Sequence, residues 1–264
     1  MKIGVIGLGM VGETIMHALQ FYHRDVIGYD KYKPSNTFED VLSAKVLFIA
    51  LPTPPKDGRL DASILLSVMS DLQKHHYSGI VVLKSTIPLE IWKALTKLNL
   101  RVVYCPEFLH EKQRLQDFVK PNVVVIAGRS EEVDVVLRDV FYWLDPETSI
   151  QYLDPPTAIM TKLVMNAYAS TKISFANEIK RICDEVNIDP RPVMETLVLE
   201  GRAAAAYTDP MKGAFGGSCL PKDLDELIHS TTKSVLLKAV REVNTIIEHE
   251  AQAKKTVKKI KVKK

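Results

Sequence analysis

The chain has 264 residues, of which 46% are hydrophobic and 25% charged, a composition typical of a globular protein of one or two domains. It contains no apolar run long enough to cross a bilayer and no recognisable signal peptide, so we expect a cytoplasmic protein without membrane segments. The three cysteines (Cys105, Cys183 and Cys219) are odd in number and widely spaced. They indicate neither a disulfide framework nor a zinc site, and we expect no bound metal.

The net charge of +3 depends on the end of the chain. The last eleven residues, Lys254–Lys264, hold seven lysines and no acid, and without those seven charges the rest of the chain carries −4. Such a segment could bind nucleic acid, but no aromatic residue stands between the lysines to stack on bases. We therefore expect a solvated helix end, and nucleic acid is not favoured as a partner.

The N-terminal residues have the order of a dinucleotide-binding unit. Lys2–Ile6 is a short apolar segment, and it leads directly into Gly7–Gly12, which reads Gly-Leu-Gly-Met-Val-Gly. A helical pattern follows, and then a second apolar segment that ends in Asp30. Strand, glycine turn, helix, strand and acid in this order are typical of the Rossmann fingerprint, whereas the glycines alone would be a weak signal.

Each glycine of the fingerprint has a physical role that a larger residue could not fill. Gly7 permits the tight turn, Gly9 allows the backbone to approach a pyrophosphate, and Gly12 allows the helix to pack closely. The helix N-terminus offers free N–H groups to the phosphates. Asp30 would accept hydrogen bonds from ribose hydroxyls and repel a 2′-phosphate, so the sequence favours NAD over NADP.

The alternation of apolar segments and helical patterns continues beyond this unit. Further strands are predicted at 46–50, 80–83, 101–104, 122–126 and 150–152. Three successive strand ends carry Thr53, Thr86 and Glu107, and ligands bind at the carboxyl ends of such strands. Taken singly, each threonine is more often a turn or cap residue. We predict an α/β fold with a Rossmann doubly wound parallel sheet over residues 1–154.

The second half of the sequence predicts helices alone. After the Pro155-Pro156 break, a long helix is expected over residues 157–186, with Lys162 and Asn166 on one face. Further helices are expected at 192–199 and from 232 to about 247. We therefore predict an all-α central domain over residues 155–264. Because the long helix is too apolar for one small domain to cover, we expect a homodimer.

The stretch 215–223 combines two glycines, a thiol and two charges. Gly216 and Gly217 would let the backbone approach another molecule, and Cys219 precedes Lys222 and Asp223 in what we expect to be a loop. A thiol beside a cation favours the thiolate, which is the nucleophile. The alternative is a glycine-rich turn with a buried, inert cysteine, followed by a helix that starts at a solvated Lys222-Asp223 pair.

These segments together resemble one family, the nucleotide-sugar 6-dehydrogenases, which include UDP-glucose 6-dehydrogenase and GDP-mannose 6-dehydrogenase. The resemblance covers nearly the whole chain, from Met1 to about Ile260. It rests on Gly7–Gly12, Pro52-Thr53-Pro54, Ser85-Thr86-Ile87-Pro88, Pro106-Glu107-Phe108-Leu109-His110-Glu111, Lys162-x-x-x-Asn166, Lys172–Glu178 and Gly216–Asp223.

The resemblance implies an NAD-dependent enzyme that oxidises a primary alcohol of a nucleotide sugar twice, through a thiohemiacetal and a thioester, to the acid. Cys219 matches the family nucleophile, and Glu107 matches the proposed general base for thioester hydrolysis. Lys162, Asn166 and Asp223 match the groups that support the oxyanion and the water. Thr86 matches a residue that contacts both the cofactor and the active-site water.

The binding residues implied by the resemblance form two sets. The cofactor set comprises Gly7, Gly9, Val11, Gly12, Asp30, Thr53, Thr86, Glu111 and Lys222. The substrate set comprises Glu107, Phe108, Leu109, Lys162, Asn166, Arg202, Tyr207, Phe215 and Gly216. The resemblance also implies a homodimer formed through the long central helix.

Three departures from the family pattern leave the sugar and the nucleotide open. The family normally continues into a third, nucleotide-binding domain, and Lys261–Lys264 resembles the approach to its first strand. The segment between Asp30 and Val46 is shorter than usual, and the loop from Tyr207 to Cys219 is one residue longer.

Two other functions stay open at this point. One is a β-hydroxyacid-type dehydrogenase, a related group that also carries Lys-x-x-x-Asn on a helix but needs no thiol. The other is a non-catalytic NAD-binding or interaction protein, such as a partner subunit.

Overall fold

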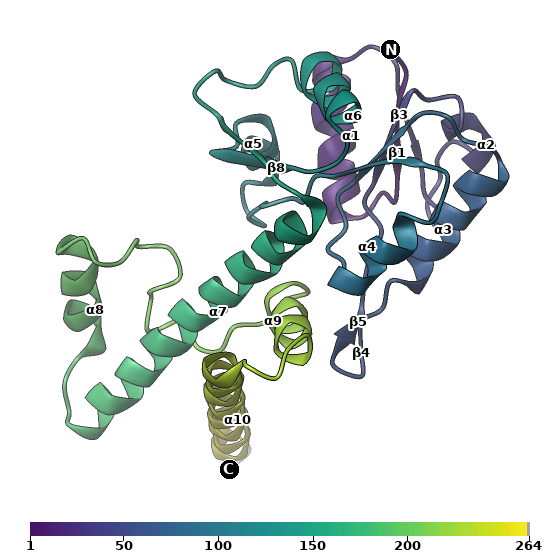
Figure 1. The fold of residues 1–264 in the computed structure, drawn as a ribbon. Helices are drawn as coiled ribbons and strands as arrows, with labels where there is room; N and C mark the ends of the chain where they lie inside the picture. The colour runs from purple at the N-terminus through teal and green to yellow at the C-terminus, as the bar shows by residue number, and fades with distance from the viewer. Residues whose placement is uncertain (263–264) are drawn as a thin grey trace. The chain divides into compact units, whose positions relative to one another are not determined.

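The computed structural model describes the backbone of residues 1–262, and the side chains of these except residue 254 and residues 257–262. The chain divides into two compact units (Figure 1). The first unit comprises Met1–Lys56 and Leu60–Lys162, and the second comprises Asp57–Arg59 and Leu163–Lys264.

The first unit holds all the longer strands. Its elements are β1 (Ile3–Ile6), α1 (Met10–Tyr22), β2 (Val26–Tyr29), α2 (Phe38–Val41), β3 (Val46–Ile49), α3 (Ser63–Lys74), β6 (Ile80–Leu83), α4 (Leu89–Leu95), β7 (Arg101–Tyr104), α5 (Arg114–Val119), β8 (Val123–Ile126), α6 (Ser130–Val135), the π-helix η1 (Val136–Val140) and β9 (Ser149–Tyr152).

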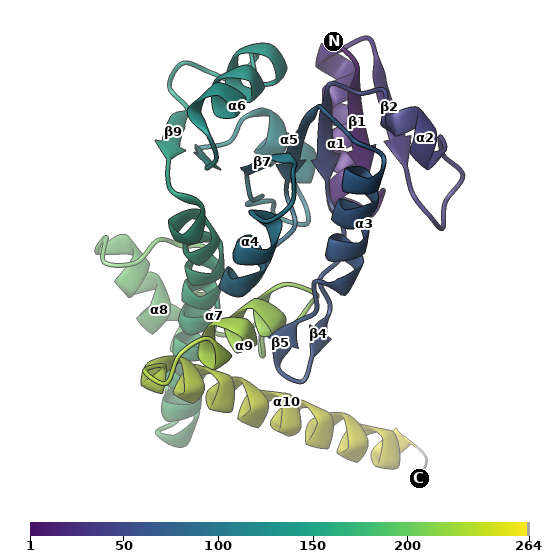
Figure 2. The ribbon, with the colours of Figure 1, turned by 45° about the vertical axis from the view of Figure 1, so that its right-hand side comes forward.

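Five of these strands form one parallel sheet in the order β2-β1-β3-β6-β7. The chain moves outward from β1 to β2 and then crosses back to β3 on the other side of β1. The point between β1 and β3, where the direction reverses, is where such sheets bind ligands. The predicted Rossmann sheet is confirmed. Its three central strands β1, β3 and β6 are apolar and buried throughout because helices cover both faces of the sheet (Figure 2).

The core follows the alternation of the strands. Ile3 and Val5 of β1, with Val46 and Phe48 of β3, belong to a cluster that includes Leu19 of α1. These residues are fully buried. At about 25 cal/mol per Å² of apolar surface, such burial is the main stabilising contribution to the sheet that carries the strand-end loops.

Two features of the first unit differ from a single regular sheet. Strands β8 and β9 pair with each other in parallel, as a separate two-stranded sheet. An antiparallel bridge between Tyr104 and Ala127 joins β7 to the residue that follows β8.

A short hairpin, which the sequence analysis did not predict, follows β3. Its strands are β4 (Pro55–Lys56) and β5 (Arg59–Leu60). The two turn residues, Asp57 and Gly58, have φ values of +51° and +76°. Two positive φ angles define the turn that matches the twist of paired strands, which explains the Asp-Gly pair.

The second unit is helical. It contains most of α7 (Pro155–Glu185), together with α8 (Pro190–Leu199), α9 (Leu220–His229) and α10 (Val235–Val262). The predicted long helix is confirmed. The expected loop ends at Cys219. Lys222 and Asp223 belong to the first turn of α9, in agreement with the alternative of a Lys-Asp helix start.

The last helix also exceeds the prediction. Helix α10 continues to Val262, beyond the predicted end near residue 247, and the helix end expected in the lysine-rich segment is present through residue 262. The prediction that Lys261–Lys264 approaches a strand is therefore wrong for residues 261 and 262, and Lys263 and Lys264 lie outside the described residues. Among the helices of the described part of the chain, none combines the length and the apolar character that a membrane span requires.

Candidate active site

The glycine loop after β1 has the geometry of a pyrophosphate cradle. Gly7 has a φ of +88°, and a Cβ atom on Gly12 would lie 1.7 Å from the carbonyl oxygen of Gly7. Gly9 has no atom within 4 Å of the place of a Cβ atom, so packing does not require glycine there. The open space at Gly9, directly before α1, fits a phosphate group that approaches the backbone. Val11 is half-buried in the first turn of α1.

Asp30 joins the end of β2 to this loop. Its Oδ2 accepts a hydrogen bond from the Leu8 amide at 2.7 Å, and its Oδ1 accepts one from the Tyr32 amide at 2.8 Å. Each carboxylate oxygen has a second acceptor site that can face a ribose hydroxyl. The glycine loop and Asp30 therefore fit the adenosine and pyrophosphate groups of NAD.

The strand-end loops after β3 and β6 are joined by hydrogen bonds. The Thr53 hydroxyl donates to the carbonyl oxygen of Thr86 at 2.8 Å. The Ser85 hydroxyl accepts from the Leu51 amide at 3.0 Å and donates to the Leu51 carbonyl at 2.8 Å. Thr53 and Thr86 are both buried. The structure thus brings these two predicted cofactor residues together at one edge of the sheet.

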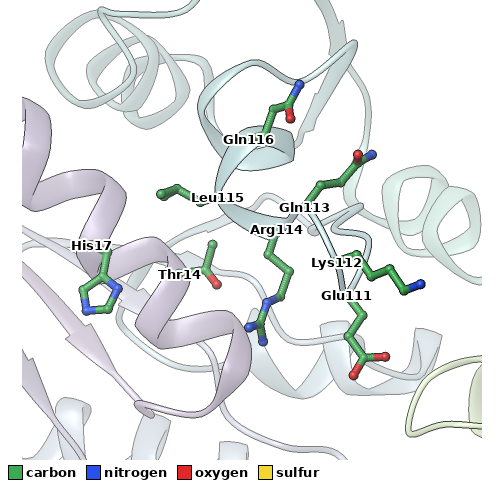
Figure 3. Close-up of a pocket in the computed structure, with 8 residues that line it drawn as sticks. All are labelled: Thr14, His17, Glu111, Lys112, Gln113, Arg114, Leu115 and Gln116. Atoms are coloured by element: carbon green, nitrogen blue, oxygen red, sulfur yellow. The ribbon is translucent and has the colours of Figure 1, made fainter.

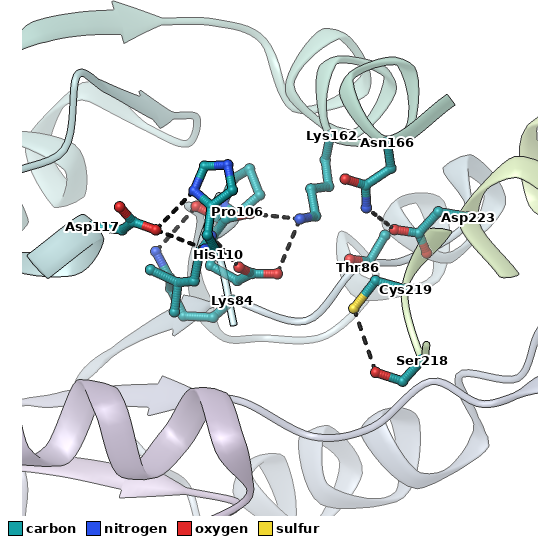
Figure 4. A network of polar contacts seen from close by, with 12 residues as sticks. Lys84, Thr86, Pro106, His110, Asp117, Lys162, Asn166, Ser218, Cys219 and Asp223 are labelled. Carbon is teal, nitrogen blue, oxygen red and sulfur yellow. Dashed lines mark hydrogen bonds and ion pairs between the residues drawn. The ribbon is translucent and has the colours of Figure 1, made fainter. Parts of the chain in front are cut away.

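Glu107 and Lys162 form a buried ion pair within the first unit (Figure 4). The Lys162 ammonium lies 3.0 Å from Glu107 Oε1 and also donates to the Glu107 carbonyl oxygen at 2.7 Å. The side chains are 5% and 11% exposed. Phe108 and Leu109 complete this group, because the Phe108 ring lies 5.4 Å from the ammonium and the Leu109 amide donates to Glu107 Oε2 at 2.8 Å.

The environment of Glu107 keeps it ionised. Burial alone would raise the pKa of the carboxyl group, but the charge of Lys162, the Leu109 amide and the charge of Lys84 together outweigh burial. The pKa of Glu107 therefore lies below its ordinary value of 4.5. At neutral pH this site holds a carboxylate beside an ammonium.

Lys84 is a functional candidate that the sequence analysis missed. It follows β6 directly and is only 5% exposed. Its ammonium donates to Cys105 Sγ at 3.4 Å and to the Pro106 carbonyl oxygen at 3.1 Å, which fixes the loop that carries Glu107 (Figure 4). A lysine at the end of a fully apolar strand was the available signal, because a buried lysine needs partners.

Glu111 lies apart from the Glu107 group. It is exposed and lines a hollow of about 290 Å³ between α1 and the start of α5 (Figure 3). Basic side chains share this hollow with it, namely His17, Lys112 and Arg114. An exposed acid beside these basic side chains can be solvated, and its contact with the cofactor stays a prediction.

In the second unit, Asn166, Asp223 and Lys222 form a second polar group. The Asn166 amide donates to Asp223 Oδ2 at 2.6 Å (Figure 4). The Lys222 ammonium donates to Asp223 Oδ1 at 2.6 Å. Asp223 is completely buried. Since Lys162 and Asn166 are one turn apart on α7, the helix fixes both side chains on one face.

Cys219 is exposed and immediately precedes α9, whereas Cys105 and Cys183 are buried. The Ser218 hydroxyl lies 3.6 Å from its sulfur. The ammonium expected to act on this thiol, that of Lys222, is bonded to Asp223 instead. The N-terminus of α9 remains as a source of partial positive charge for negative charge that develops at Cys219.

The remaining predicted substrate residues differ in exposure. Arg202 is exposed and pairs with Glu200 at 2.8 Å. Phe215 is buried, and Gly216 is exposed with no atom within 4 Å of the place of a Cβ atom. Tyr207 has a φ of +68°, in the left-handed region that non-glycine residues rarely adopt. The structure does not test whether these residues contact the substrate, so their role in substrate binding stays a prediction.

A dinucleotide cradle, a buried lysine–carboxylate pair and an exposed thiol define the class of NAD-dependent oxidoreductases. Within the described residues, no group of three or more His, Cys, Asp or Glu side chains could hold a metal ion. Comparison with known proteins assigns the chain more narrowly.

Two family profiles match the chain. The NAD binding domain of the UDP-glucose/GDP-mannose dehydrogenase family matches residues 30–145, and the central domain of that family matches residues 156–246. The protein YtcA of Bacillus subtilis is 30% identical over 292 residues, which cover 92% of this chain and 67% of YtcA. The UDP-glucose 6-dehydrogenase of Rickettsia bellii is 27% identical, covering 78% of this chain and 50% of that protein.

A solved structure agrees with these matches. The UDP-glucose dehydrogenase of Pyrobaculum islandicum has a TM-score of 0.82 and 27% identity, covering 93% of this chain and 68% of that chain. The chain belongs to the UDP-glucose/GDP-mannose dehydrogenase family, whose N-terminal domain binds NAD. It spans between half and about two thirds of the length of these relatives.

Proposed function

We propose that the chain catalyses the NAD-dependent, four-electron oxidation of a nucleotide-sugar primary alcohol to the corresponding uronic acid through a thioester on Cys219. The observation that carries the proposal is the polar set on two successive turns of α7. Lys162 there holds the Glu107 carboxylate, and Asn166 holds Asp223, four residues beyond the exposed Cys219 thiol. UDP-glucose is the first substrate to test, because the Rickettsia and Pyrobaculum relatives carry its name.

Two molecules of NAD, bound in turn, would supply the acceptors for the two hydrides. The chain's own residues bind the reacting carbon, stabilise charge on the substrate oxygen and transfer the protons. The sulfur of Cys219 adds to the carbon of the aldehyde and forms a C–S bond, so that the second oxidation starts from a tetrahedral adduct. That oxidation leaves a thioester, and attack by water then breaks the C–S bond and returns the thiol.

The polar groups have complementary roles in these steps. The described contacts use two of the three Lys162 N–H donors, so one remains to stabilise negative charge on the substrate oxygen. Glu107 is ionised and takes a proton from the attacking water. Asp223 holds the amide of Asn166 in one orientation, so that the other donor of the amide can face the substrate oxygen.

The assembly is proposed to be a homodimer formed through α7. Its exposed apolar side chains include Tyr168, Phe175 and Ile182, spaced seven residues apart along one stripe, with Val164 and Met165 beside them. A stripe of this period is the seam that a second helix covers. We also propose a functional domain boundary at residues 154/155, where Asp154 Oδ1 accepts from the Thr157 amide at 3.1 Å and caps α7. A free, working thiol favours the reducing cytoplasm.

The test follows NADH by absorbance with UDP-glucose, GDP-mannose and related nucleotide sugars. We expect two NADH per sugar consumed, and no acid formed by Cys219→Ala. The matched control is Cys183→Ala, which removes a buried thiol of α7 and should keep both hydride transfers. Tight NAD binding without turnover on any sugar would contradict the proposal and favour a non-catalytic subunit. One NADH per substrate, unaffected by Cys219→Ala, would favour the β-hydroxyacid-type reaction.

A further inference from the structure

The loop that leads to Cys219 is attached to two helices by buried amide side chains. From α10, Asn244 accepts a hydrogen bond from the Phe215 amide at 2.7 Å and donates to the Phe215 carbonyl oxygen at 3.0 Å. From α7, Asn177 donates to the Gly213 carbonyl oxygen at 2.8 Å. All of these contacts lie within the second unit.

The orientation of Asn244 is uniquely determined. Its second N–H donates to Glu248 Oε1 at 3.1 Å, so both donors and the acceptor of the amide are used. Asn244 is completely buried, and Phe215 is only 3% exposed. If the amide were absent, the N–H and C=O groups of Phe215 would be buried without partners, which is costly. The amide therefore holds this backbone position in one place.

The backbone of Phe215, which Asn244 holds, lies between two glycines in the left-handed region. Gly213 and Gly217 have φ values of +76° and +78°, and neither has an atom within 4 Å of the place of a Cβ atom. Packing at the Cβ position therefore restrains neither glycine, and the hydrogen bond from Asn177 to the carbonyl oxygen is what holds Gly213. Phe215 is midway between them, and Cys219 follows Gly217 by two residues. Asn244 consequently fixes the segment from which the nucleophile and the exposed Gly216 backbone are presented.

We propose that Asn244 is the positioning residue of the nucleophile loop, with Asn177 as its second support. The residue makes its described contacts with the loop backbone and with Glu248, so it acts through the loop. The catalytic meaning of this assignment rests on the function proposed above, whereas the effect on loop order does not. Removal of the amide should loosen residues 213–218 while the helices around them keep their packing.

The experiment compares Asn244→Leu with Ser174→Ala in the full chain. Leucine has nearly the shape of asparagine and makes no hydrogen bond. Ser174 is a matched control, because it is 3% exposed and its hydroxyl joins α7 to the Val240 carbonyl oxygen of α10 at 3.0 Å without contacting the loop. Amide hydrogen exchange of peptides covering residues 213–218 is the first measurement. We expect exchange about tenfold faster or more in Asn244→Leu and unchanged in Ser174→Ala.

The second measurement is alkylation of Cys219 by iodoacetamide, with and without UDP-glucose. The other two thiols are buried, so Cys219 should react first. UDP-glucose should protect the wild-type thiol and protect Asn244→Leu at least tenfold less well at equal concentration. If UDP-glucose protects neither protein while exchange still rises, the substrate assignment is wrong and the positioning role stands.

Two outcomes would overturn the positioning role. One is unchanged loop exchange in Asn244→Leu, and the other is an equal rise in Ser174→Ala. If Asn244→Leu does not fold, Asn244→Asp replaces it, since the carboxylate keeps the acceptor for the Phe215 amide and loses the donor to its carbonyl oxygen. Loop exchange in Asn244→Asp should then exceed that of the wild type, and exchange equal to the wild type would refute the role of the donor.

Discussion

Lys162→Met is the substitution that most directly tests the buried pair of the first unit. It removes the ammonium that lies 3.0 Å from Glu107 Oε1 and 2.7 Å from the Glu107 carbonyl oxygen. Methionine has nearly the helix propensity and length of lysine, so α7 itself should be unaffected. What remains is a carboxylate that is 11% exposed and has lost its main counter-charge.

The expected cost follows from that burial. Removing one partner of a buried ion pair destabilises a protein by about 3–5 kcal/mol, because the remaining charge stays uncompensated. Burial is already the largest single influence on Glu107, and without the opposing ammonium the pKa of the carboxyl group should rise above its ordinary value of 4.5. The neutral double variant Lys162→Met/Glu107→Gln should therefore recover roughly half of the loss or more.

Urea unfolding at pH 7 measures these free energies. The matched control is Lys180→Met on the same helix, where the lysine is 27% exposed and pairs with Asp184 at the surface. That surface pair should contribute less than about 1 kcal/mol. Equal losses in Lys162→Met and Lys180→Met, or no recovery in the double variant, would refute the assignment of Glu107 as a buried charge held by Lys162.

Three further predictions concern pH, the cofactor and assembly. Because the pKa of Glu107 is lowered on folding, its stabilising contribution is present above pH 4.5 and is lost as the pH falls through the lower folded pKa; Glu107→Gln should flatten the acid limb of the stability–pH curve, and an unchanged limb would contradict this. Gly9→Ala should keep the melting temperature and weaken NAD binding measured by calorimetry. Gly12→Ala should lower both the melting temperature and the NAD affinity, since its Cβ would lie 1.7 Å from the Gly7 carbonyl oxygen. Equal melting temperatures of the two variants would refute the close packing at Gly12. Phe175→Glu should shift the sedimentation coefficient from dimer to monomer. Phe21→Glu, at an aromatic outside α7 that is even more exposed (82% against 48%), should not.

The sequence was sufficient for the sheet because its signals are local. Each short apolar run lies between turn residues. The geometry of the glycine fingerprint is determined by six adjacent residues. The strands and the parallel sheet were therefore predictable from Lys2–Ile6 and from the similar apolar segments that follow it. The Asp57-Gly58 hairpin was also encoded locally, and its Asp-Gly dipeptide would have revealed it. The start of α9 had a comparable signal in Pro221, which stands in the first turn.

The rest of the candidate site depends on contacts between distant residues. Lys162 meets Glu107 across 55 positions, and Asn244 meets Phe215 across 29. Nothing near Asn244 in the sequence distinguishes it from a solvated residue of an amphipathic helix. Only the packing of α10 buries its amide group, which then forms hydrogen bonds with the backbone of Phe215. The pairing of Lys222 with Asp223, rather than with the thiol, is likewise a matter of geometry that residue types leave open.

The resting pair of Glu107 and Lys162 also bears on how the proposed reaction would be ordered. A carboxylate with a lowered pKa is a weak base, so the arrangement in the structure is poorly suited to activate water. The charge of Lys162 is the largest influence that lowers this pKa, and it opposes burial, which raises it. If the ammonium turns toward negative charge on a substrate oxygen, the carboxylate loses that influence and becomes more basic. One movement would then supply a cation to the oxyanion and a base to the water. In the proposed mechanism, Glu107 would gain basicity only after charge develops on the substrate, so the site would not activate water while no substrate is bound.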